Sequence, residues 1–343
     1  MTLEQEVIDY LNRNPGSSSS EILEGIPGSK SLATLKRELS RLVEAGYLQL
    51  SGRGKGTRYS VAPAYRLLQP VNLSEYFLQE IDERAIRPFD FELIKITLAE
   101  TSVFTENETE KLTKLQEIYA ENCSRLSPAA YKKELERLAI DLSWKSSQIE
   151  GNTYSLLETE RLLKEHETAS GKTRDEATML INHKEAIDFI IAQSDYLVPL
   201  SIAKIEDIHK ILTKDLNIDR NIRNRRVGIS GTNYQPPDNE FHIREALEET
   251  CRLINNKPDV FEKALLSLLL LSYIQPFADG NKRTARIVSN AILMNYKYCP
   301  LSFRTVDSLE YKKAMLLFYE QNNLSAFKGL FIEQFEFAVE TYF

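Results

Sequence analysis

Residues 274–286, Ile-Gln-Pro-Phe-Ala-Asp-Gly-Asn-Lys-Arg-Thr-Ala-Arg, are the most informative stretch of this 343-residue chain. An apolar segment precedes them, Pro-Phe interrupts it, and Asp-Gly-Asn predicts a tight turn that opens a second helix. A helix start presents free backbone N–H groups and favours an anion. Lys282, Arg283 and Arg286 add three cations where acids are normally preferred. A multiply charged anion resolves that conflict, so the residues predict a polyphosphate site, with Asp279 placed to hold Mg²⁺.

A second interpretation of this turn remains open from the residues alone. The three cations can instead belong to a solvated basic turn that is neutralised by acids elsewhere in the chain, such as Glu150. Under that interpretation the turn binds no ligand.

The length and composition are those of a soluble globular protein with two domains. Hydrophobic residues make up 42% and charged residues 27% of the chain, and the formal net charge is −7. The chain therefore has no overall basic field that would hold nucleic acid or an anionic membrane. The longest apolar run, around residues 264–271, is far shorter than the roughly 20 residues of a membrane span. The three widely spaced cysteines fit buried thiols in a reducing compartment, so we expect a cytoplasmic protein without membrane contact.

The first 62 residues read as three helices followed by a hairpin. Apolar residues recur at helical spacing in residues 3–11 and 32–43, and two strand-like segments, 47–50 and 57–61, flank a Gly-rich basic loop. This order resembles a winged helix-turn-helix, in which a basic third helix and the wing contact DNA. A protein-docking role is the alternative. The candidate DNA-contacting residues are Lys36, Arg37, Arg41, Arg53, Lys55 and Arg58.

The remainder of the chain shows helical periodicity almost throughout, so the predicted fold class is mainly α. We expect a winged helix-turn-helix at 1–62, a helical connector at 63–130, and a main helical domain at 131–343. The exception to the helical pattern is residues 226–234, where apolar residues alternate before two glycine- and proline-containing turns. That stretch predicts strand-like structure.

The 274–286 stretch resembles the signature of Fic-domain proteins, His-Pro-Phe-x-(Asp or Glu)-Gly-Asn-(Gly or Lys)-Arg-x-x-Arg. Every signature position matches except the first. Members of that family typically transfer AMP from ATP to a hydroxyl group of a target protein. By position, the resemblance implies Asp279 as the Mg²⁺ ligand, Gly280, Asn281 and Lys282 as the anion nest, and Arg283 and Arg286 as holders of the β- and γ-phosphates.

Residues 146–152, Ser-Ser-Gln-Ile-Glu-Gly-Asn, resemble the inhibitory motif of the same family, Ser/Thr-x-x-x-Glu-(Gly or Asn). Ser146 and Glu150 are four residues apart and so share one helix face, and Gly151 is a suitable helix stop. In the family this glutamate pairs with the second signature arginine, here Arg286. The resemblance implies that Glu150 prevents productive placement of the γ-phosphate.

Residues 227–236, Val-Gly-Ile-Ser-Gly-Thr-Asn-Tyr-Gln-Pro, resemble the flap of the family, a hairpin that registers the backbone of the target protein by strand addition. The flap residues expected to face the target are Ile229, Gly231, Thr232 and Tyr234. Together, the signature, the inhibitory motif and the flap extend the resemblance over about residues 140–300.

The signature histidine acts as general base in the family, and Gln275 occupies its position. A carboxamide has no usable basic site near neutral pH, although it can hydrogen-bond a hydroxyl. General acid–base catalysis contributes typically about 10²–10⁴-fold, so we expect transfer to be strongly impaired while nucleotide binding persists. An inactivating substitution introduced by engineering is the alternative origin of Gln275.

Two functions are consistent with these features. The first is a degenerate Fic protein that binds ATP, or another nucleotide, with Mg²⁺ and is related to protein adenylyltransferases. The second is a nucleotide-sensing, DNA-binding regulator without catalytic activity. The expected partners are an unknown target protein and DNA bound through residues 1–62. The oligomeric state stays open, with a homodimer as one alternative.

Overall fold

The computed structural model describes residues 2–28 and 30–343, apart from the side chain of Lys55. The chain divides into two compact units, Met1–Pro70 and Val71–Phe343. The division lies further along the chain than residue 62, because the helix α4 (Pro63–Leu68) places Tyr65 in the core of the first unit. The stretch expected as a connector, 63–130, is therefore shared between the two units.

The first unit has three helices followed by an antiparallel hairpin, in the predicted order. Ser18 begins the second helix with a capping box, which satisfies N–H groups that the helix leaves free. In the hairpin, Leu48 lies opposite Val61. The elements are α1 (Leu3–Arg13), α2 (Ser19–Gly25), α3 (Leu32–Glu44), β1 (Leu48–Ser51), the 3-10 turn η1 (Gly54–Gly56), β2 (Arg58–Val61) and α4.

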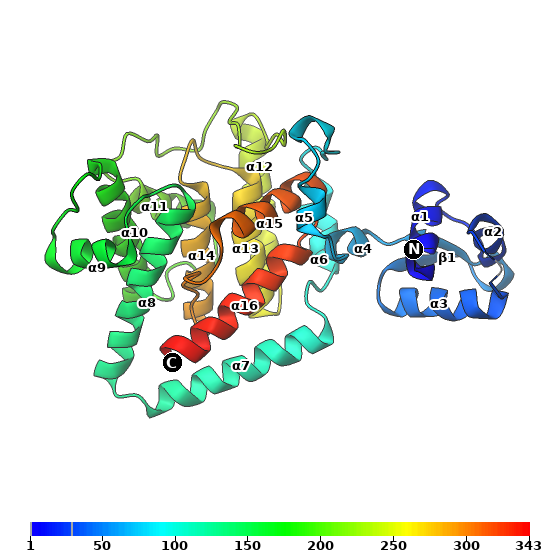
Figure 1. Ribbon diagram of the computed structural model, residues 1–343, viewed down its shortest axis with the longest axis horizontal. Coiled ribbons are helices and arrows are strands. Elements are labelled where there is room, and N and C mark those ends of the chain that lie inside the picture. The colour runs from blue at the N-terminus through cyan, green and yellow to red at the C-terminus, as the bar shows by residue number, and fades with distance from the viewer. Residues whose placement is uncertain (1, 29) are drawn as a thin grey trace. The chain divides into compact units, whose positions relative to one another are not determined.

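The second unit is built around α13 (Val260–Ile274), every residue of which is buried. A helix that is apolar on all sides belongs in the interior of a domain. α14 (Asn281–Asn295) packs against it, and α8 (Pro128–Ile149), α10 (Arg174–Ala192) and α11 (Ile202–Leu212) contact α14 in turn (Figure 1). The chain between α13 and α14 therefore lies where several helices meet.

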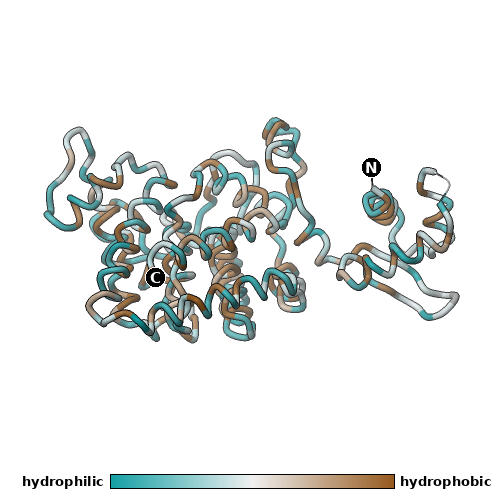
Figure 2. Tube along the Cα trace, turned by 60° about the horizontal axis from the view of Figure 1, so that its bottom comes forward, coloured by the Kyte–Doolittle hydropathy of each residue, from teal (hydrophilic) through white to brown (hydrophobic). Residues whose placement is uncertain are grey.

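The other helices of the second unit enclose this centre. α7 runs alongside α16 at the edge of the unit (Figure 1). Both units contain polar and apolar residues along their whole length (Figure 2). The remaining elements are α5 (Leu73–Tyr76), η2 (Ile81–Glu83), the π-helix η3 (Leu93–Thr97), α6 (Leu98–Glu100), α7 (Glu106–Arg125), α9 (Leu156–Glu165), α12 (Glu240–Asn256), α15 (Ser308–Gln321) and α16 (Ser325–Tyr342).

The mainly α fold class is confirmed, but the predicted hairpin at 226–234 is not formed. In the described part of the chain the only sheet is the two-stranded β1–β2 of the first unit. Gly231 adopts a φ of 89°, and Pro236 and Pro237 have no N–H to donate to a ladder. The segment forms no strand pairing, and Ser230 and Gly231 lie in a turn. Across the described residues, no helix combines the length and the apolar character that crossing a membrane requires.

Candidate functional site: an anion-binding turn

The turn between α13 and α14 has two residues in the left-handed region. Gln275 ends α13 with a φ of 50°, and Gly280 precedes α14 with a φ of 78°. A Cβ atom at position 280 would also lie 3.4 Å from Nε2 of His209. No side chain among the described residues caps the start of α14. The N–H groups of its first turn are therefore available to an anion, as at other helix starts.

The side chain of Asn281 holds the turn together instead of reaching outward. Its Oδ1 accepts from the N–H of Phe277 at 2.8 Å, and its Nδ2 donates to the carbonyl of Phe277 at 2.9 Å. The same Nδ2 lies 2.9 Å from Oε1 of Gln275. Asn281 can therefore contribute to an anion nest through its backbone N–H.

Both ends of the Gln275 carboxamide are engaged inside the turn. Its Nε2 donates to the carbonyl of Ser272 at 2.6 Å, and its Oε1 accepts from Asn281. The residue is 8% exposed. Gln275 thus braces the end of α13 against the start of α14, and as a carboxamide it offers no base.

Arg283 is a buried cation that lacks partners for most of its donors. It is 1% exposed, and its Nε and Nη1 atoms have no hydrogen-bond partner. Its Nη2 lies 3.6 Å from Oδ2 of Asp279. Burial lowers the pKa of Arg283 from its ordinary value. An unpaired buried charge is costly, so the geometry favours an anion that supplies the missing acceptors.

Arg286, one turn further along α14, is fully occupied. Its Nε donates to Oγ of Ser146 at 2.8 Å, its Nη1 to the hydroxyl of Tyr311 at 3.2 Å, and its Nη2 to the carbonyl of Ser146 at 3.0 Å. Its Nη2 also pairs with Oε1 of Glu150 at 3.0 Å. The pairing of Glu150 with Arg286 that the inhibitory motif implied is present.

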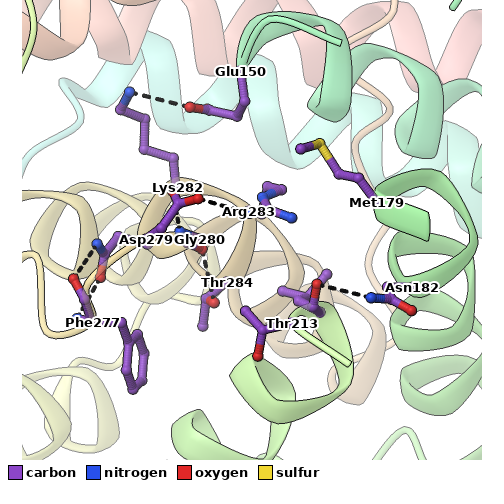
Figure 3. Close-up of polar contacts among 12 residues, drawn as sticks. Glu150, Met179, Asn182, Thr213, Phe277, Asp279, Gly280, Lys282, Arg283 and Thr284 are labelled. Atoms are coloured by element: carbon purple, nitrogen blue, oxygen red, sulfur yellow. Dashed lines mark hydrogen bonds and ion pairs between the residues drawn. The ribbon is translucent and has the colours of Figure 1, made fainter. Parts of the chain in front are cut away.

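Glu150 reaches a second cation of the same helix. Its Oε2 lies 3.3 Å from Nζ of Lys282, and Figure 3 shows Lys282 extending toward the carboxylate. Burial by itself raises the pKa of Glu150, but the charges of Arg286 and Lys282 outweigh it and hold the pKa below its ordinary value. Gly151, at a φ of 100°, follows the end of α8 and lets the chain turn away.

His183 forms a hydrogen bond with Ser146. Because Arg286 donates to Oγ of Ser146, the Ser146 hydroxyl proton is free to be donated to Nε2 of His183 at 2.6 Å. Burial and the nearby arginine charges keep the pKa of His183 well below its ordinary value, so the imidazole is neutral and can accept. Sequence reasoning missed this residue, which no motif marks.

Asp279 is suited to contribute one oxygen ligand to a divalent cation. Its side chain is 68% exposed, and its Oδ1 accepts from the N–H of Gly280 at 2.6 Å. The described residues contain no group of three or more metal-binding side chains. Mg²⁺ is typically bound by one or two carboxylates together with phosphate oxygens and water, so a single carboxylate fits that ion only with a phosphate ligand present.

Two further residues that the sequence did not single out hold the turn in place. The ring of His209 stacks on Phe277 with centroids 3.7 Å apart, and its Nε2 donates to the carbonyl of Asp279 at 3.0 Å. Arg223 donates to the carbonyls of Gln275 and Pro237, each at 2.6 Å. Both lie far from residues 274–286 in sequence, so only the fold reveals them.

The expected flap residues divide into two groups. Ile229 and Gly231 line the cavity beside the turn, whereas Thr232 lies outside it and accepts from the N–H of Tyr234. Tyr234 is 2% exposed and donates its hydroxyl to the carbonyl of Tyr273 at 3.0 Å. The Tyr234 side chain therefore belongs to the core, and a contact of this position with a target protein stays a prediction for its backbone alone.

The turn forms the floor of a cavity of about 700 Å³. Glu150, the 227–231 segment and the α15 residues Tyr311 and Tyr319 also line it. One further wall comes from residues 77–81 and Arg84, which the sequence reasoning did not include. The volume falls within the range of small-molecule pockets, which is about 300–1,000 Å³.

The candidate DNA-contacting residues of the first unit differ in their surroundings. Arg41 pairs with Glu38 at 2.7 Å and with Glu4 at 2.6 Å, and Arg58 pairs with Glu21. Lys36, Arg37 and Arg53 are exposed. The side chain of Lys55 lies outside the described part of the structure.

The helical fold and the anion-binding turn resemble those of the Fic/DOC family, whose family model matches residues 199–293 of this chain. The chain is 28% identical over 187 residues to a protein adenylyltransferase Fic of Nematostella vectensis, a match that covers 52% of this chain and 43% of that protein. The chain spans less than half the length of the curated relatives it matches.

Solved structures share the fold at low sequence identity. Fic-1 (residues 134–508) from C. elegans superimposes with a TM-score of 0.60 at 21% identity, covering 69% of this chain and 72% of that one. A Fic domain containing signaling protein from Bacteroides thetaiotaomicron gives a TM-score of 0.58 at 19% identity, covering 67% of this chain and 94% of that one. At these identities the likeness establishes the fold alone.

Proposed function

We propose that the chain binds ATP, or a related nucleotide, with Mg²⁺ in the cavity at the start of α14. The observation that carries the proposal is Arg283, a buried guanidinium with two nitrogen atoms that lack acceptors. A phosphate group supplies acceptors in the fork geometry that arginine prefers. Free N–H groups of the α14 start and the exposed Asp279 complete the donor and ligand set of a Mg²⁺-polyphosphate.

The chain is related to protein adenylyltransferases, and we propose that its transfer of AMP to a target-protein hydroxyl is impaired. Gln275 stands where the family has its general base, and its carboxamide is engaged by Ser272 and Asn281. Mg²⁺ would supply charge neutralisation of the phosphates through Asp279. The residues of the chain would bind and orient the nucleotide. The Gln275 carboxamide cannot accept the proton of the target-protein hydroxyl.

The engaged carboxamide also favours a second candidate function, a nucleotide-sensing regulator without catalytic activity. In that case the first unit would bind DNA through its exposed cations, including Lys36 and Arg37. The proposed partners under the two functions are an unknown target protein and DNA. A homodimer is one alternative for the oligomeric state. The two functions differ in whether any AMP is transferred.

Calorimetry with ATP and Mg²⁺ on the parent and on Arg283→Ala tests the nucleotide site. We expect the variant to lose about 100-fold in affinity, because the charged hydrogen bonds to phosphate are removed. Arg252→Ala is the matched control, since Arg252 is an exposed arginine on α12 that pairs with Glu249. Equal ATP affinity in the parent and Arg283→Ala, with both folded, would contradict the proposed site.

A further inference from the structure

A short segment before the main helices, residues 76–87, is fastened to the end of α15. The Tyr76 hydroxyl donates to Oε2 of Glu320 at 2.7 Å, and the N–H of Arg87 donates to the Glu320 carbonyl at 2.9 Å. Nη1 of Arg84 lies 3.0 Å from Oε1 of Glu320. Glu320 is 0% exposed, so its carboxylate is compensated by this segment.

The other terminal nitrogen of Arg84, Nη2, contacts the cavity wall. This atom donates to the carbonyl of Gly231 at 2.8 Å. The guanidinium carbon of Arg84 also lies 5.1 Å from the ring centroid of Phe77. One planar side chain therefore joins α15, the 76–87 segment and the 227–231 segment, which a lysine could not do in the same geometry.

The 227–231 segment depends on the contact with Arg84 more than a strand would, because a strand is also held by hydrogen bonds to its neighbour. It forms no strand pairing within the described residues, and Gly231 has the conformational freedom of a glycine at positive φ. A neighbouring hydrogen bond, from Nδ2 of Asn233 to Oδ1 of Asp82 at 2.8 Å, is exposed. The bond from Arg84 is part-buried and charge-assisted, so it contributes more to holding the segment in place.

The segment and the anion-binding turn line the same cavity. Residues 227–231 and Arg84 belong to its walls, whereas residues 278–283 form its cationic end. A polyphosphate alone would occupy the cationic end. A nucleotide would also extend along the walls, because its nucleoside part lies beyond the phosphates.

We propose that Arg84 is a positioning residue for nucleotide binding: it holds the 227–231 wall against α15 at the spacing that the nucleoside part requires. The proposal rests on the proposed nucleotide-binding function. It assigns a role in the site to a residue that lies outside the signature, the inhibitory motif and the flap. The expected signature is a loss of affinity for ATP without a loss of affinity for a bare polyphosphate.

The test compares Arg84→Lys with the parent. Lysine keeps a charge for Glu320 but has a single donor group in place of the fork, so the bond to Gly231 is lost. We expect amide hydrogen exchange in residues 228–232 to rise about tenfold, and ATP affinity to fall about tenfold, as the loss of one charged hydrogen bond implies. Affinity for inorganic tripolyphosphate should change less than about twofold, because its site lies at the α14 start.

Tyr76→Phe is the matched control, because it removes a hydrogen bond to the same Glu320 carboxylate without touching the 227–231 segment. It should raise the exchange and lower the ATP affinity less than Arg84→Lys does. The double variant Arg84→Met/Glu320→Leu serves if Arg84→Lys does not fold, since replacing both members of a buried pair leaves no unpaired charge. It should show the same signature as Arg84→Lys.

Unchanged exchange at 228–232 in the variants would overturn the proposal. Equal losses for ATP and tripolyphosphate would also overturn it, because they would indicate general distortion of the site. If the parent itself binds neither ligand, the proposed function fails. The exchange comparison on the ligand-free protein would still decide whether Arg84 positions the wall.

Discussion

Oε1 of Glu150 lies 3.0 Å from Nη2 of Arg286, and its Oε2 lies 3.3 Å from Nζ of Lys282. One carboxylate from the end of α8 thus neutralises two cations of α14 while Arg283 keeps two nitrogen atoms without partners. In the ligand-free protein, the cations of the site therefore fall into two groups. Arg283 has donors without acceptors, whereas Arg286 is already paired with Glu150.

The first prediction concerns Glu150→Gln. Removing the negative charge frees Lys282 and Arg286 for phosphate, so we expect ATP affinity to rise about tenfold. Calorimetry with ATP and Mg²⁺ measures the change. Glu160→Gln is the control, because Glu160 is an exposed glutamate on α9 that pairs with Lys164. ATP binding by Glu150→Gln no tighter than by Glu160→Gln would show that Glu150 does not restrict the site.

The second prediction concerns restoration of the general base. We expect Gln275→His combined with Glu150→Gly to transfer AMP, most readily to the protein itself, with a gain of about 10²–10⁴-fold over Glu150→Gly alone. Both changes are needed, because the Glu150 carboxylate would still occupy Arg286 after the base is restored. The measurement is incorporation of labelled AMP from ATP.

The control for this experiment is Gln275→Ala combined with Glu150→Gly. It removes the bonds from Gln275 to Ser272 and Asn281 as the histidine variant does, but adds no base. Losing these bonds costs about 1 kcal/mol each, so both variants should be somewhat less stable than the parent. A histidine variant that binds ATP yet transfers nothing would favour the sensor function.

The third prediction is acid sensitivity caused by His209. Burial lowers its pKa to about 4 from the ordinary 6.5. His209 therefore takes up a proton near pH 6.5 in the unfolded chain, but only near pH 4 in the folded protein. The stability contributed by neutral His209 is complete above pH 6.5 and is lost as the pH falls toward 4. At pH 5 we expect a loss of about 2 kcal/mol from this residue.

Urea unfolding at pH 7.5 and pH 5 checks this expectation. His209→Gln, which can still donate toward the Asp279 carbonyl, should lose less stability than the parent between the two pH values, by about 2 kcal/mol. His242→Gln controls for removal of an exposed histidine. Parallel losses in the parent and His209→Gln would rule out His209 as the source of the pH dependence.

The fourth prediction concerns the first unit. Lys36 and Arg37 are exposed on α3, whereas Arg41 and Arg58 are paired with acids. In the full chain, Lys36→Ala/Arg37→Ala should weaken binding to duplex DNA and reduce the slope of log affinity against log salt by about 2. Lys132→Ala/Lys133→Ala, at exposed positions of α8, is the control with the same loss of charge. No duplex binding by the parent at low salt would favour a protein-docking role.

Much of the fold could be predicted because its signals are local. The helical periodicity of the first unit, the capping of α2 by Ser18 and the glycine turn before α14 each depend on residues a few positions apart. The ion pair of Glu150 with Arg286 spans a long stretch of sequence and could be predicted only from the motif resemblance. The hairpin that the flap resemblance implied at 226–234 is not formed, since apolar alternation does not show whether a segment finds a strand partner.

The mainly α fold, the turn that precedes α14 and the types of residue in that turn could all be inferred from local sequence. Which of those residues are free to act depends on packing between distant parts of the chain. Packing buries Tyr234 against Tyr273, engages both ends of the Gln275 carboxamide, and leaves two nitrogen atoms of Arg283 without acceptors. The physical reason is range: turns and helix ends are set by neighbouring residues, whereas burial and hydrogen-bond satisfaction depend on which distant side chains packing brings together.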